Sequence, residues 1–416
     1  MRTARDRPSP EGINMAKIRP FIGLRPKREV APLVAELPYD VVTSEEAREV
    51  AAKNEYSFYH ITKPEVDLPE QVHVYDDRVY QTGRGNLDAF IRSGILQLDE
   101  SPKFFLYTLI MEEREQTGLV ACVHIDDYMN NVIRKHELTR EEKELDRSKH
   151  MDVLNAQTGL VFILYRQTGG KTMLFEKGMG IEPEYDFITS DTIRHIFRVI
   201  SDKDLCDSFV DAFRDEILYI ADGHHRAASA VRVGLSRRDA GLGGESEWFM
   251  AVIFPHDQVR ILPYNRVVRG LGGGIDSLLK RLAEKYDVQK TDHPVPDSPR
   301  KFCMYLKGEW FRLIPRFTVD KTSCMLDVAM LQETILEPLL NIENPRTDSR
   351  IEFIGGIKGS TELEHFVDSE GDSVAFSLYP VSVEELMRVS DSGGIMPPKS
   401  TWFEPKLRSG LVLHLL

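Results

Sequence analysis

The chain has 416 residues, which is enough for two or three domains of ordinary size. Hydrophobic residues make up 42% and charged residues 29%, a balance that excludes a disordered chain, a collagen-like fibre and a coiled-coil rod. Asp and Glu number 66 against 53 Lys and Arg, so the net charge is −13. Because so acidic a surface repels phosphate backbones, we expect no general binding to nucleic acid.

The cysteines and the apolar runs indicate a cytoplasmic protein. Four cysteines are scattered without a C-x-x-C pair or a zinc-type spacing, which predicts buried or idle thiols in a reducing compartment: Cys122, Cys206, Cys303 and Cys324. No apolar run approaches the roughly 18–20 residues that a membrane span requires. Residues 1–14 are basic and lack the apolar core of a signal peptide. Met15 opens a cleaner start, so we expect these residues to be either a flexible extension or the product of a misplaced start codon.

The N-terminal half mixes short strands with helices. In chain order, its patterns predict a strand at 17–24, helices at 43–54 and 70–93, a β-hairpin at 103–128 around Gly118, a helix at 135–157, a strand at 160–166 and a helix near 190–201. The helix at 43–54 opens with a capping signature at Thr43. The helix at 135–157 is densely charged, with many i, i+4 pairs of opposite charge, so we expect a solvated helix that includes Asp146 and Arg147.

The second half continues the same mixture. It predicts a strand at 216–220, a helix at 227–233 that ends at Gly234, strands at 249–254 and 259–263, a helix at 276–286, a hairpin at 301–314 around Lys307-Gly308, a helix at 326–341, a strand at 350–354, a helix at 360–368, a strand at 373–379 and a helix at 382–390. The glycine-rich stretch 270–274 is typical of a linker, and we place a domain boundary there.

One segment combines a strand, a tight glycine turn and a helix. Asp222, Gly223, His224, His225 and Arg226 follow the strand at 216–220 directly and lead into the next helix. A helix N-terminus presents N–H groups and the positive end of its dipole, so this turn favours an anion. Gly223 lets a ligand approach the backbone closely, and Arg226 can bind phosphate through two parallel hydrogen bonds.

The same residues allow other interpretations. Asp222, at the end of the strand, could hold Mg²⁺ or a sugar hydroxyl, or it could simply cap the helix while the two histidines lie at the surface. Adjacent histidines on one helix point apart, and no third ligand follows at a useful spacing, so we expect no zinc site.

The Asp-Gly-His-His-Arg string at 222–226 resembles the nucleotide-binding box of the ParB/sulfiredoxin superfamily. The whole chain resembles a bacterial family of uncharacterised proteins that carries this box in mid-chain. Among the related proteins of known activity, the free-serine kinases carry the same string and phosphorylate L-serine with ADP or ATP. Sulfiredoxins have a cysteine at the position of His224, so the resemblance argues against sulfinic-acid reduction. It implies ATP or ADP with Mg²⁺, bound by Gly223, His224, His225 and Arg226, with Asp222 as a catalytic residue and metal ligand.

The resemblance continues toward the C-terminus. The segments 301–315, 326–341, 350–356 and 371–379 follow the element order of the smaller domain of the serine kinases. Residues 383–388 and 395–401 resemble that family's helix and the S-P-K-T-T segment after it. The resemblance implies that Lys399 contacts the transferring phosphoryl group and that Ser400 and Thr401 donate hydrogen bonds to phosphate or substrate. Because two prolines cannot continue a helix, we expect 395–401 to be extended. The resemblance implies that this segment returns to the 222–226 turn.

The acceptor-side base is assigned by the same resemblance. In the serine kinases a catalytic glutamate follows a proline in a Pro-His-Glu string, and the closest stretch here is Pro38-Tyr39-Asp40. Asp40 is one methylene shorter, yet a carboxylate near the acceptor hydroxyl can accept its proton during phosphoryl transfer. Glu36 is the alternative base, and a plain turn residue is the alternative interpretation of Asp40.

The patterns predict an α+β protein, and the resemblance implies a ParB/sulfiredoxin-like nucleotide-binding core with an N-terminal α/β elaboration and a smaller C-terminal α+β domain. We divide the chain into a flexible extension at 1–14, the elaboration plus core at 15–270, the smaller domain at 271–394 and a C-terminal segment at 395–416 that returns to the core.

The favoured function is a small-molecule kinase that transfers a phosphoryl group from ATP or ADP to a hydroxyl, with free L-serine as a candidate acceptor. One alternative is a ParB-like nucleotide-binding regulatory or DNA-associated protein without kinase activity; another is a protein that senses a nucleotide or phospho-metabolite without turnover. A DNA-binding relative would need a helix-turn-helix after the box, whereas residues 235–275 predict strands and glycine turns. The donor, the acceptor and the oligomeric state stay open at this point.

Overall fold

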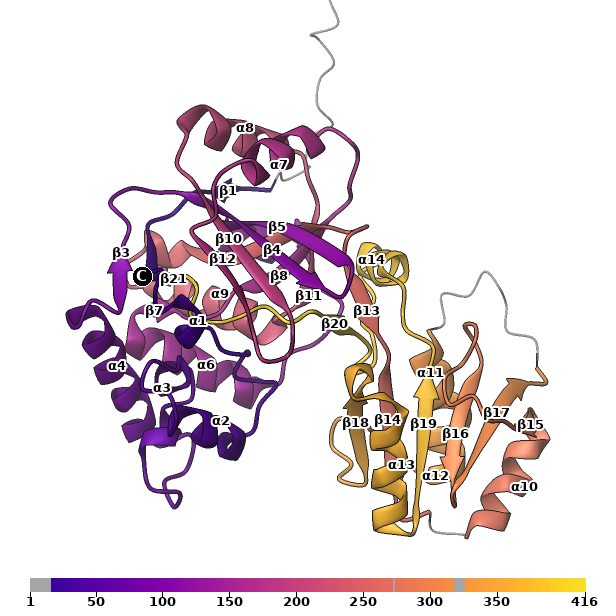
Figure 1. Ribbon diagram of the computed structural model, residues 1–416. Helices are drawn as coiled ribbons and strands as arrows, with labels where there is room; N and C mark the ends of the chain where they lie inside the picture. The colour runs from indigo at the N-terminus through magenta and orange to yellow at the C-terminus, as the bar shows by residue number, and fades with distance from the viewer. Residues whose placement is uncertain (1–15, 272–273, 318–325) are drawn as a thin grey trace, which may run out of the picture. The chain divides into compact units, whose positions relative to one another are not determined.

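The computed structural model describes residues 16–271, 274–317 and 326–416 (Figure 1). The chain divides into two compact units. The first contains the described residues up to 134, residues 139–258 and the C-terminal segment 405–416, and the second contains residues 135–138 and 259–404. Both units combine helices with sheets, so the predicted α+β class is confirmed. The expected extension at 1–14 lies outside the described residues.

The first unit is built on a nine-stranded mixed sheet. Its strands are β1 (Ile18–Arg19), β4 (Phe104–Met111), β5 (Arg114–His124), β6 (Ile133–Arg134), β8 (Val161–Tyr165), β9 (Tyr185–Ile188), β10 (Arg194–Ile200), β11 (Leu218–Asp222) and β12 (Trp248–Pro255). Their order is β6-β11-β8-β12-β5-β4-β10-β9, with β1 beside β5. β11 runs parallel to β6 and β12 parallel to β8, whereas the other pairs are antiparallel.

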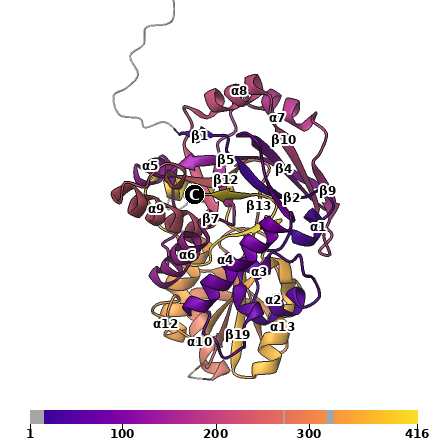
Figure 2. The same ribbon diagram turned by 90° about the vertical axis from the view of Figure 1, so that its left-hand side faces the viewer.

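Helices cover one face of this sheet. They are α5 (Ile125–Met129), α7 (Thr172–Met179), α8 (Lys203–Phe213) and α9 (His224–Asp239). Alternate residues of β8, such as Val161 and Ile163, share one buried cluster with Phe209 of α8 and Ala230 of α9. Figure 2 shows α7 and α8 above the sheet in that view. The period of two along β8 therefore turns one row of side chains to the helices.

A smaller sheet and a group of helices complete the first unit. The sheet has the order β3 (Leu96–Leu98), β2 (Gly23–Pro26), β21 (Leu413–Leu415) and β7 (Ala156–Gln157). The further helices are α1 (Ala31–Val34), α2 (Ser44–Ala51), α3 (Tyr59–Thr62), η1 (Pro64–Asp67), α4 (Asp77–Arg92), α6 (Glu141–Leu154) and η2 (Glu245–Glu247). The predicted capping signature is confirmed, since Thr43 Oγ1 accepts from the Glu46 N–H at 3.1 Å and Glu46 Oε2 accepts from the Thr43 N–H at 2.7 Å.

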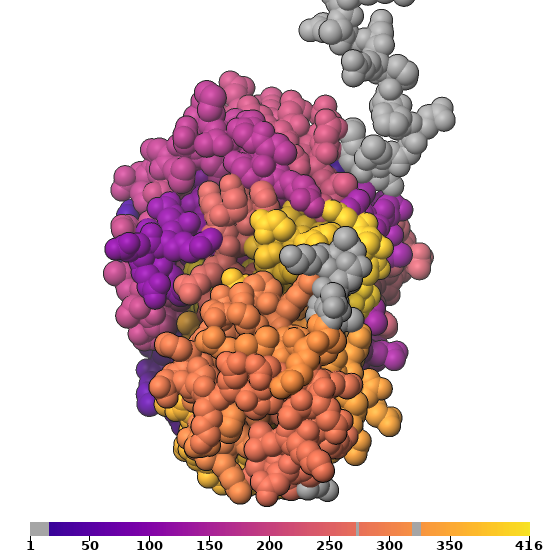
Figure 3. Space-filling view, turned by 90° about the vertical axis from the view of Figure 1, so that its right-hand side faces the viewer, coloured from indigo at the N-terminus to yellow at the C-terminus, as the bar shows by residue number. Residues whose placement is uncertain are grey.

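The second unit contains a six-stranded antiparallel sheet. Its order is β15 (Tyr286–Lys290), β17 (Glu309–Pro315), β16 (Phe302–Leu306), β19 (Ser373–Leu378), β14 (Tyr264–Arg269) and β18 (Ile351–Gly355), and a separate ribbon joins β13 (Arg260–Leu262) to β20 (Trp402–Glu404). Its helical elements are α10 (Ile275–Lys285), α11 (Asp327–Leu331), η3 (Gln332–Leu336), α12 (Glu337–Leu340), η4 (Gly356–Lys358), α13 (Gly359–Glu370) and α14 (Val383–Asp391). Figure 3 views this unit from the side of α10 and β15. The predicted β16–β17 hairpin is confirmed, because Lys307 and Gly308 have φ values of 52° and 77°.

The unit boundaries do not coincide with the glycine-rich stretch. β14 pairs with β18 and β19, so the second unit begins at Val259, ahead of Gly270. It ends at Glu404, after which the chain re-enters the first unit. The three described cysteines are buried free thiols, and Cys324 lies outside the described residues. Among the described residues, no helix is both long and apolar enough to span a membrane.

Three predicted elements are wrong in type or position. The hairpin at 104–124 turns after Met111, where Glu112 has a φ of 58°, and Gly118 lies in the middle of β5. A Cβ at Gly118 would approach Val252 Cγ2 to 2.7 Å, so this glycine serves close packing and not a turn. The segment near 190–201 is strand β10, not a helix, because its apolar residues are buried on both faces of the sheet. The helix predicted from residue 70 begins at Asp77.

The densely charged helix also differs from the prediction. Asp146, His150 and Met151 of α6 are buried, and the helix packs against α4 and α9. Its charges are therefore not simply solvated: Asp146 pairs with Arg147 at 2.7 Å and accepts from the Tyr80 hydroxyl at 2.8 Å. Burial of a charged pair requires such partners.

Helix α9 continues through Gly234 and ends at Asp239, so the predicted end at Gly234 is wrong. A Cβ at Gly234 would lie 2.4 Å from the Ser246 carbonyl oxygen, so the glycine allows the helix to approach η2. We expect Gly234→Ala to lower the free energy of unfolding by about 1–3 kcal/mol, because the backbone must shift to relieve the overlap.

Urea denaturation measures this loss. Gly85→Ala, in α4, is the matched control, since no atom lies within 4 Å of the added Cβ. It should raise the stability by about 0.5–1 kcal/mol through helix propensity alone. Equal effects of the two substitutions would refute the close-contact role of Gly234.

Candidate anion-binding turn and adjoining cavity

The strand, glycine turn and helix predicted at 216–233 are present. β11 ends at Asp222, Gly223 adopts a left-handed conformation with φ of 89°, and α9 begins at His224. Asp222 Oδ1 accepts from the Gly223 N–H at 3.0 Å, which holds the carboxylate at the turn. Gly223 occupies the N-cap position and has no side chain to accept from the first N–H groups of the helix. The positive end of a 16-residue helix thus meets the end of strand β11.

Arg226 lies in a narrow slot between two glycines. A Cβ at Gly223 would be 3.0 Å from Arg226 Cζ, and a Cβ at Gly159 would be 3.2 Å from Arg226 Cδ. The residue is 8% exposed, and its Nη1 donates to the Leu160 carbonyl. Its Nε is buried and has no hydrogen-bond partner in the structure. The guanidinium thus keeps one donor that a ligand could satisfy.

Lys406 is a second cation at this turn, and the sequence patterns did not indicate it. Its Nζ lies 3.2 Å from Asp222 Oδ2, and its side chain is 10% exposed. Arg226 Nη2 lies 4.0 Å from the same oxygen. Lys406 belongs to the C-terminal segment 405–416, some 180 residues after the box, so only the folded chain brings the two together.

The two histidines of the box have different environments. His224 is 7% exposed, which contradicts the alternative of a surface histidine at that position. His225 is half-buried, and its Nε2 accepts from the Arg140 N–H at 3.1 Å. His225 therefore anchors the start of α6 beside the turn.

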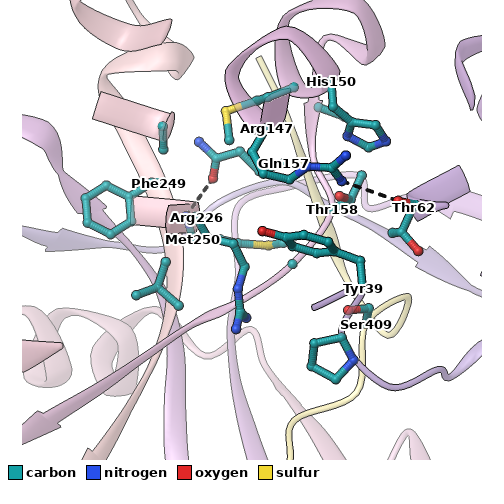
Figure 4. Close-up of a pocket in the computed structure, with 16 residues that line it drawn as sticks. Tyr39, Thr62, Arg147, His150, Gln157, Thr158, Arg226, Phe249, Met250 and Ser409 are labelled. Atoms are coloured by element: carbon teal, nitrogen blue, oxygen red, sulfur yellow. Dashed lines mark hydrogen bonds between the residues drawn. The ribbon is translucent and has the colours of Figure 1, made fainter. Parts of the chain in front are cut away.

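A cavity of about 40 Å³ adjoins Arg226 in the first unit (Figure 4). Arg147 of α6 lies over the ring of Tyr39, with 4.4 Å from Cζ to the ring centroid. Arg147 also donates from Nη1 to the Thr62 carbonyl at 3.3 Å. His150 Nε2 bonds the Ile61 carbonyl at 2.9 Å, and burial, together with the charge of Arg147, lowers the pKa of His150 to about 3. The sequence patterns missed Arg147 and His150 because a charged helix usually faces solvent.

The two candidate bases lie on the segment that precedes α2. Asp40 is exposed in a turn next to the cavity residue Tyr39. Glu36 is half-buried, accepts from the Ser57 hydroxyl at 2.6 Å and pairs through its backbone with Ser409, another cavity residue. Burial raises the pKa of Glu36 to about 7, although the Ser57 hydrogen bond opposes the shift. Both carboxylates are therefore placed in the same unit as the box.

Lys399, Ser400 and Thr401 belong to the second unit. The segment is not extended throughout, since Lys399 has a φ of 54° and bends the chain. Its Nζ lies 5.5 Å from the ring centroid of Tyr264, and Ser400 Oγ donates to the Pro397 carbonyl at 2.7 Å. Thr401 is half-buried. These local contacts give the segment a defined conformation of its own.

The family of the chain follows from its sequence. The family described as "Protein of unknown function (DUF1015)" matches residues 18–332, which include the box and the cavity residues of α6. The chain belongs to this family. Its membership confirms the resemblance of the whole chain to a family that carries the box in mid-chain. No curated protein matches the chain.

Solved structures show remote similarity only. A free serine kinase variant in complex with ADP is 14% identical, with a TM-score of 0.36 over 68% of this chain and 87% of that chain. SbnI with a C-terminal truncation, from Staphylococcus aureus, is 12% identical, with a TM-score of 0.37 over 69% of this chain and 84% of that chain. A conserved hypothetical protein from Pyrococcus furiosus is 13% identical, with a TM-score of 0.34 over 69% and 92% of the two chains. At these values the similarity says nothing about the activity of this chain.

Proposed function

We propose that the protein binds ATP or ADP at the 222–226 turn and transfers a phosphoryl group to the hydroxyl of a small molecule such as L-serine. The observation that carries this proposal is the left-handed Gly223 between β11 and α9, with two buried cations beside it. Such a turn suits phosphate oxygens, because helix N–H groups, Arg226 and Lys406 all favour negative charge in one place. The resemblance of the string to a nucleotide-binding box points to the same ligand.

Mg²⁺ would bind here through a single protein carboxylate. Mg²⁺ in phosphoryl-transfer sites typically takes one or two carboxylates together with substrate phosphates, and Asp222 supplies one. Lys406, 3.2 Å from Oδ2, occupies part of that carboxylate, so the ion would have to displace its Nζ. The ion would neutralise charge on the transferring group.

The other roles rest on the resemblance. Asp40 accepts the proton of the acceptor hydroxyl, with Glu36 as the alternative base. Lys399 supplies positive charge to the transferring group, and Ser400 and Thr401 supply hydrogen bonds. The regulatory alternative has less support, because residues after α9 form β12, β13 and β14 and the net charge is −13.

Arg226→Ala should weaken the binding of ATP and ADP by about 1.5–3 kcal/mol, the value of a hydrogen bond to a charged group. Isothermal titration calorimetry on the full chain measures it. Arg232→Ala is the matched control, because Arg232 lies on the same helix and pairs with Glu144 on its exposed side. Circular dichroism checks that both variants are folded.

Two results would contradict the proposal. One is an Arg226→Ala variant that binds both nucleotides as the wild type does. The other is the absence of phosphorylated product, followed by phosphorus NMR, when the wild type is incubated with ATP or ADP, Mg²⁺ and L-serine or related hydroxy compounds. Nucleotide binding without any turnover would favour a sensor.

A further inference from the structure

The cavity beside Arg226 has an unusual charge balance. Its lining includes two arginines, Arg147 and Arg226, and no aspartate or glutamate. Asp146 is not a lining residue, and it accepts from Arg147 Nε at 2.7 Å. Met151, Phe249 and other apolar side chains form much of the remaining wall, which lowers the local dielectric and strengthens charge interactions inside.

Hydroxyl groups also belong to the lining. Three of them are those of Tyr39, Thr158 and Ser409. Figure 4 shows the Tyr39 ring between Arg147 and Arg226, with Thr158 and Ser409 nearby. The neighbouring amide of Gln157 is satisfied, since it donates to the Trp248 carbonyl and accepts from the Met250 N–H at 2.7 Å. The three hydroxyls thus come from separate segments of the chain and line one small space.

The size of the cavity selects among anions. About 40 Å³ accommodates roughly three water-sized groups, since one probe sphere takes about 10–15 Å³. A carboxylate has three heavy atoms and is planar, whereas phosphate has five and is tetrahedral. The smaller carboxylate therefore fits the cavity better in size.

We infer that this cavity holds the carboxylate of a small hydroxy or amino acid, with the guanidinium of Arg147 opposite its charge and the hydroxyls of Tyr39, Thr158 and Ser409 as donors. The inference rests on the proposed function in one respect: the bound acid is the phosphoryl acceptor. Arg226 lines the cavity and also belongs to the 222–226 turn, so an acid held here lies next to the nucleotide-binding residues. The carboxylate then selects acids over neutral alcohols.

Calorimetry on the full chain without nucleotide tests the carboxylate. The probes are acetate, L-serine, inorganic phosphate and ethanolamine, which keeps the hydroxyl and amine of serine but lacks the carboxylate. We expect acetate and L-serine to bind and ethanolamine not to bind. Binding of ethanolamine as tight as that of L-serine, or of phosphate more tightly than acetate, would overturn the assignment.

Two substitutions locate the site, and a third serves as their control. Tyr39→Phe keeps the ring under Arg147 and removes one donor, so the affinity for acetate and L-serine should fall about 10- to 100-fold. Ala230→Leu fills the cavity and should abolish binding, whereas Ala228→Leu, which lines a separate depression on the outer side of α9, should not change it. Unchanged binding in Tyr39→Phe would disprove the cavity as the site.

The same variants separate this inference from the proposed function. ADP affinity should be unchanged in Tyr39→Phe, because the Tyr39 hydroxyl does not belong to the turn. If ADP fails to bind the wild type while acetate binds and is lost in Tyr39→Phe, the kinase proposal fails and the carboxylate site stands. If ADP binds but no carboxylate does, the cavity assignment fails and the nucleotide site stands.

Discussion

Asp40→Asn should leave ADP affinity unchanged and lower the turnover of phosphoryl transfer by about 10²–10⁴-fold, because an amide keeps the shape of the carboxylate but cannot accept a proton. The measurement is steady-state turnover with saturating nucleotide and acceptor, alongside calorimetry with ADP. Asp40 is exposed, so the substitution should cost little stability. Near-normal turnover in this variant would move the role of base to Glu36.

Glu36→Gln distinguishes the two bases by pH. Burial raises the pKa of Glu36 to about 7 from an ordinary value of 4.5. If Glu36 is the base, turnover in the wild type rises as the pH passes 7, and Glu36→Gln abolishes both the rise and the activity. If Asp40 is the base, Glu36→Gln keeps the turnover and its pH profile.

The raised pKa of Glu36 also makes the stability of the fold depend on pH. A carboxyl whose pKa is higher in the folded protein binds its proton more tightly there, so it stabilises the fold at low pH. This contribution is complete below about 4.5 and is lost as the pH rises through about 7. Glu36→Gln should remove this decline in stability with rising pH. Urea denaturation of the wild type and the variant between pH 4.5 and 8 measures the difference.

Arg408→Ala should lower the free energy of unfolding of the first unit by on the order of 3 kcal/mol. Arg408 is buried, its Nη2 donates to Asp191 and, at 3.1 Å, to Thr189 Oγ1, and its Nε lies 3.4 Å from His195 Nε2. Burial, followed by the charge of Arg408, lowers the pKa of His195 to about 3, so this histidine stays neutral. Without the guanidinium, Asp191 loses its cation and the network loses several bonds.

Urea denaturation at pH 7 measures the loss. Arg214→Ala is the matched control, since Arg214 makes a surface ion pair with Asp211 at 2.6 Å and should change stability by less than about 0.5 kcal/mol. A loss below about 1 kcal/mol in Arg408→Ala would mean that the network does not anchor the C-terminal segment. Neighbouring Leu411 and Leu413 are fully buried, so this segment should unfold together with the sheet that it contacts.

Local signals in the sequence determined much of the secondary structure. The capping box at Thr43, the Lys307-Gly308 hairpin turn and the strand–Gly223–helix turn all depend on residues within about five positions of one another, and all are present. Backbone conformation and short-range hydrogen bonds decide such elements, and both are encoded in neighbouring residues. The candidate turn at 222–226 could therefore be located from the order of its residues alone.

Contacts between distant residues decided the rest. Gly118 and Gly234 are not turn or cap residues, because Val252 and the Ser246 carbonyl approach them from other elements. The charges of α6 are not solvated, because Tyr80 and other distant groups bury and pair them.

The chemistry of the candidate site depends on the same long-range packing. Lys406 reaches Asp222 from the C-terminal segment, and Tyr39, Arg147 and Ser409 meet around one cavity from three separate parts of the chain. The sequence by itself determined the α+β class and the strand–glycine–helix turn, at which it predicts an anion site. Only the tertiary structure decided which cations flank that turn and which donors line the space beside it, because side chains far apart in sequence become neighbours only when the sheet and its helices have packed.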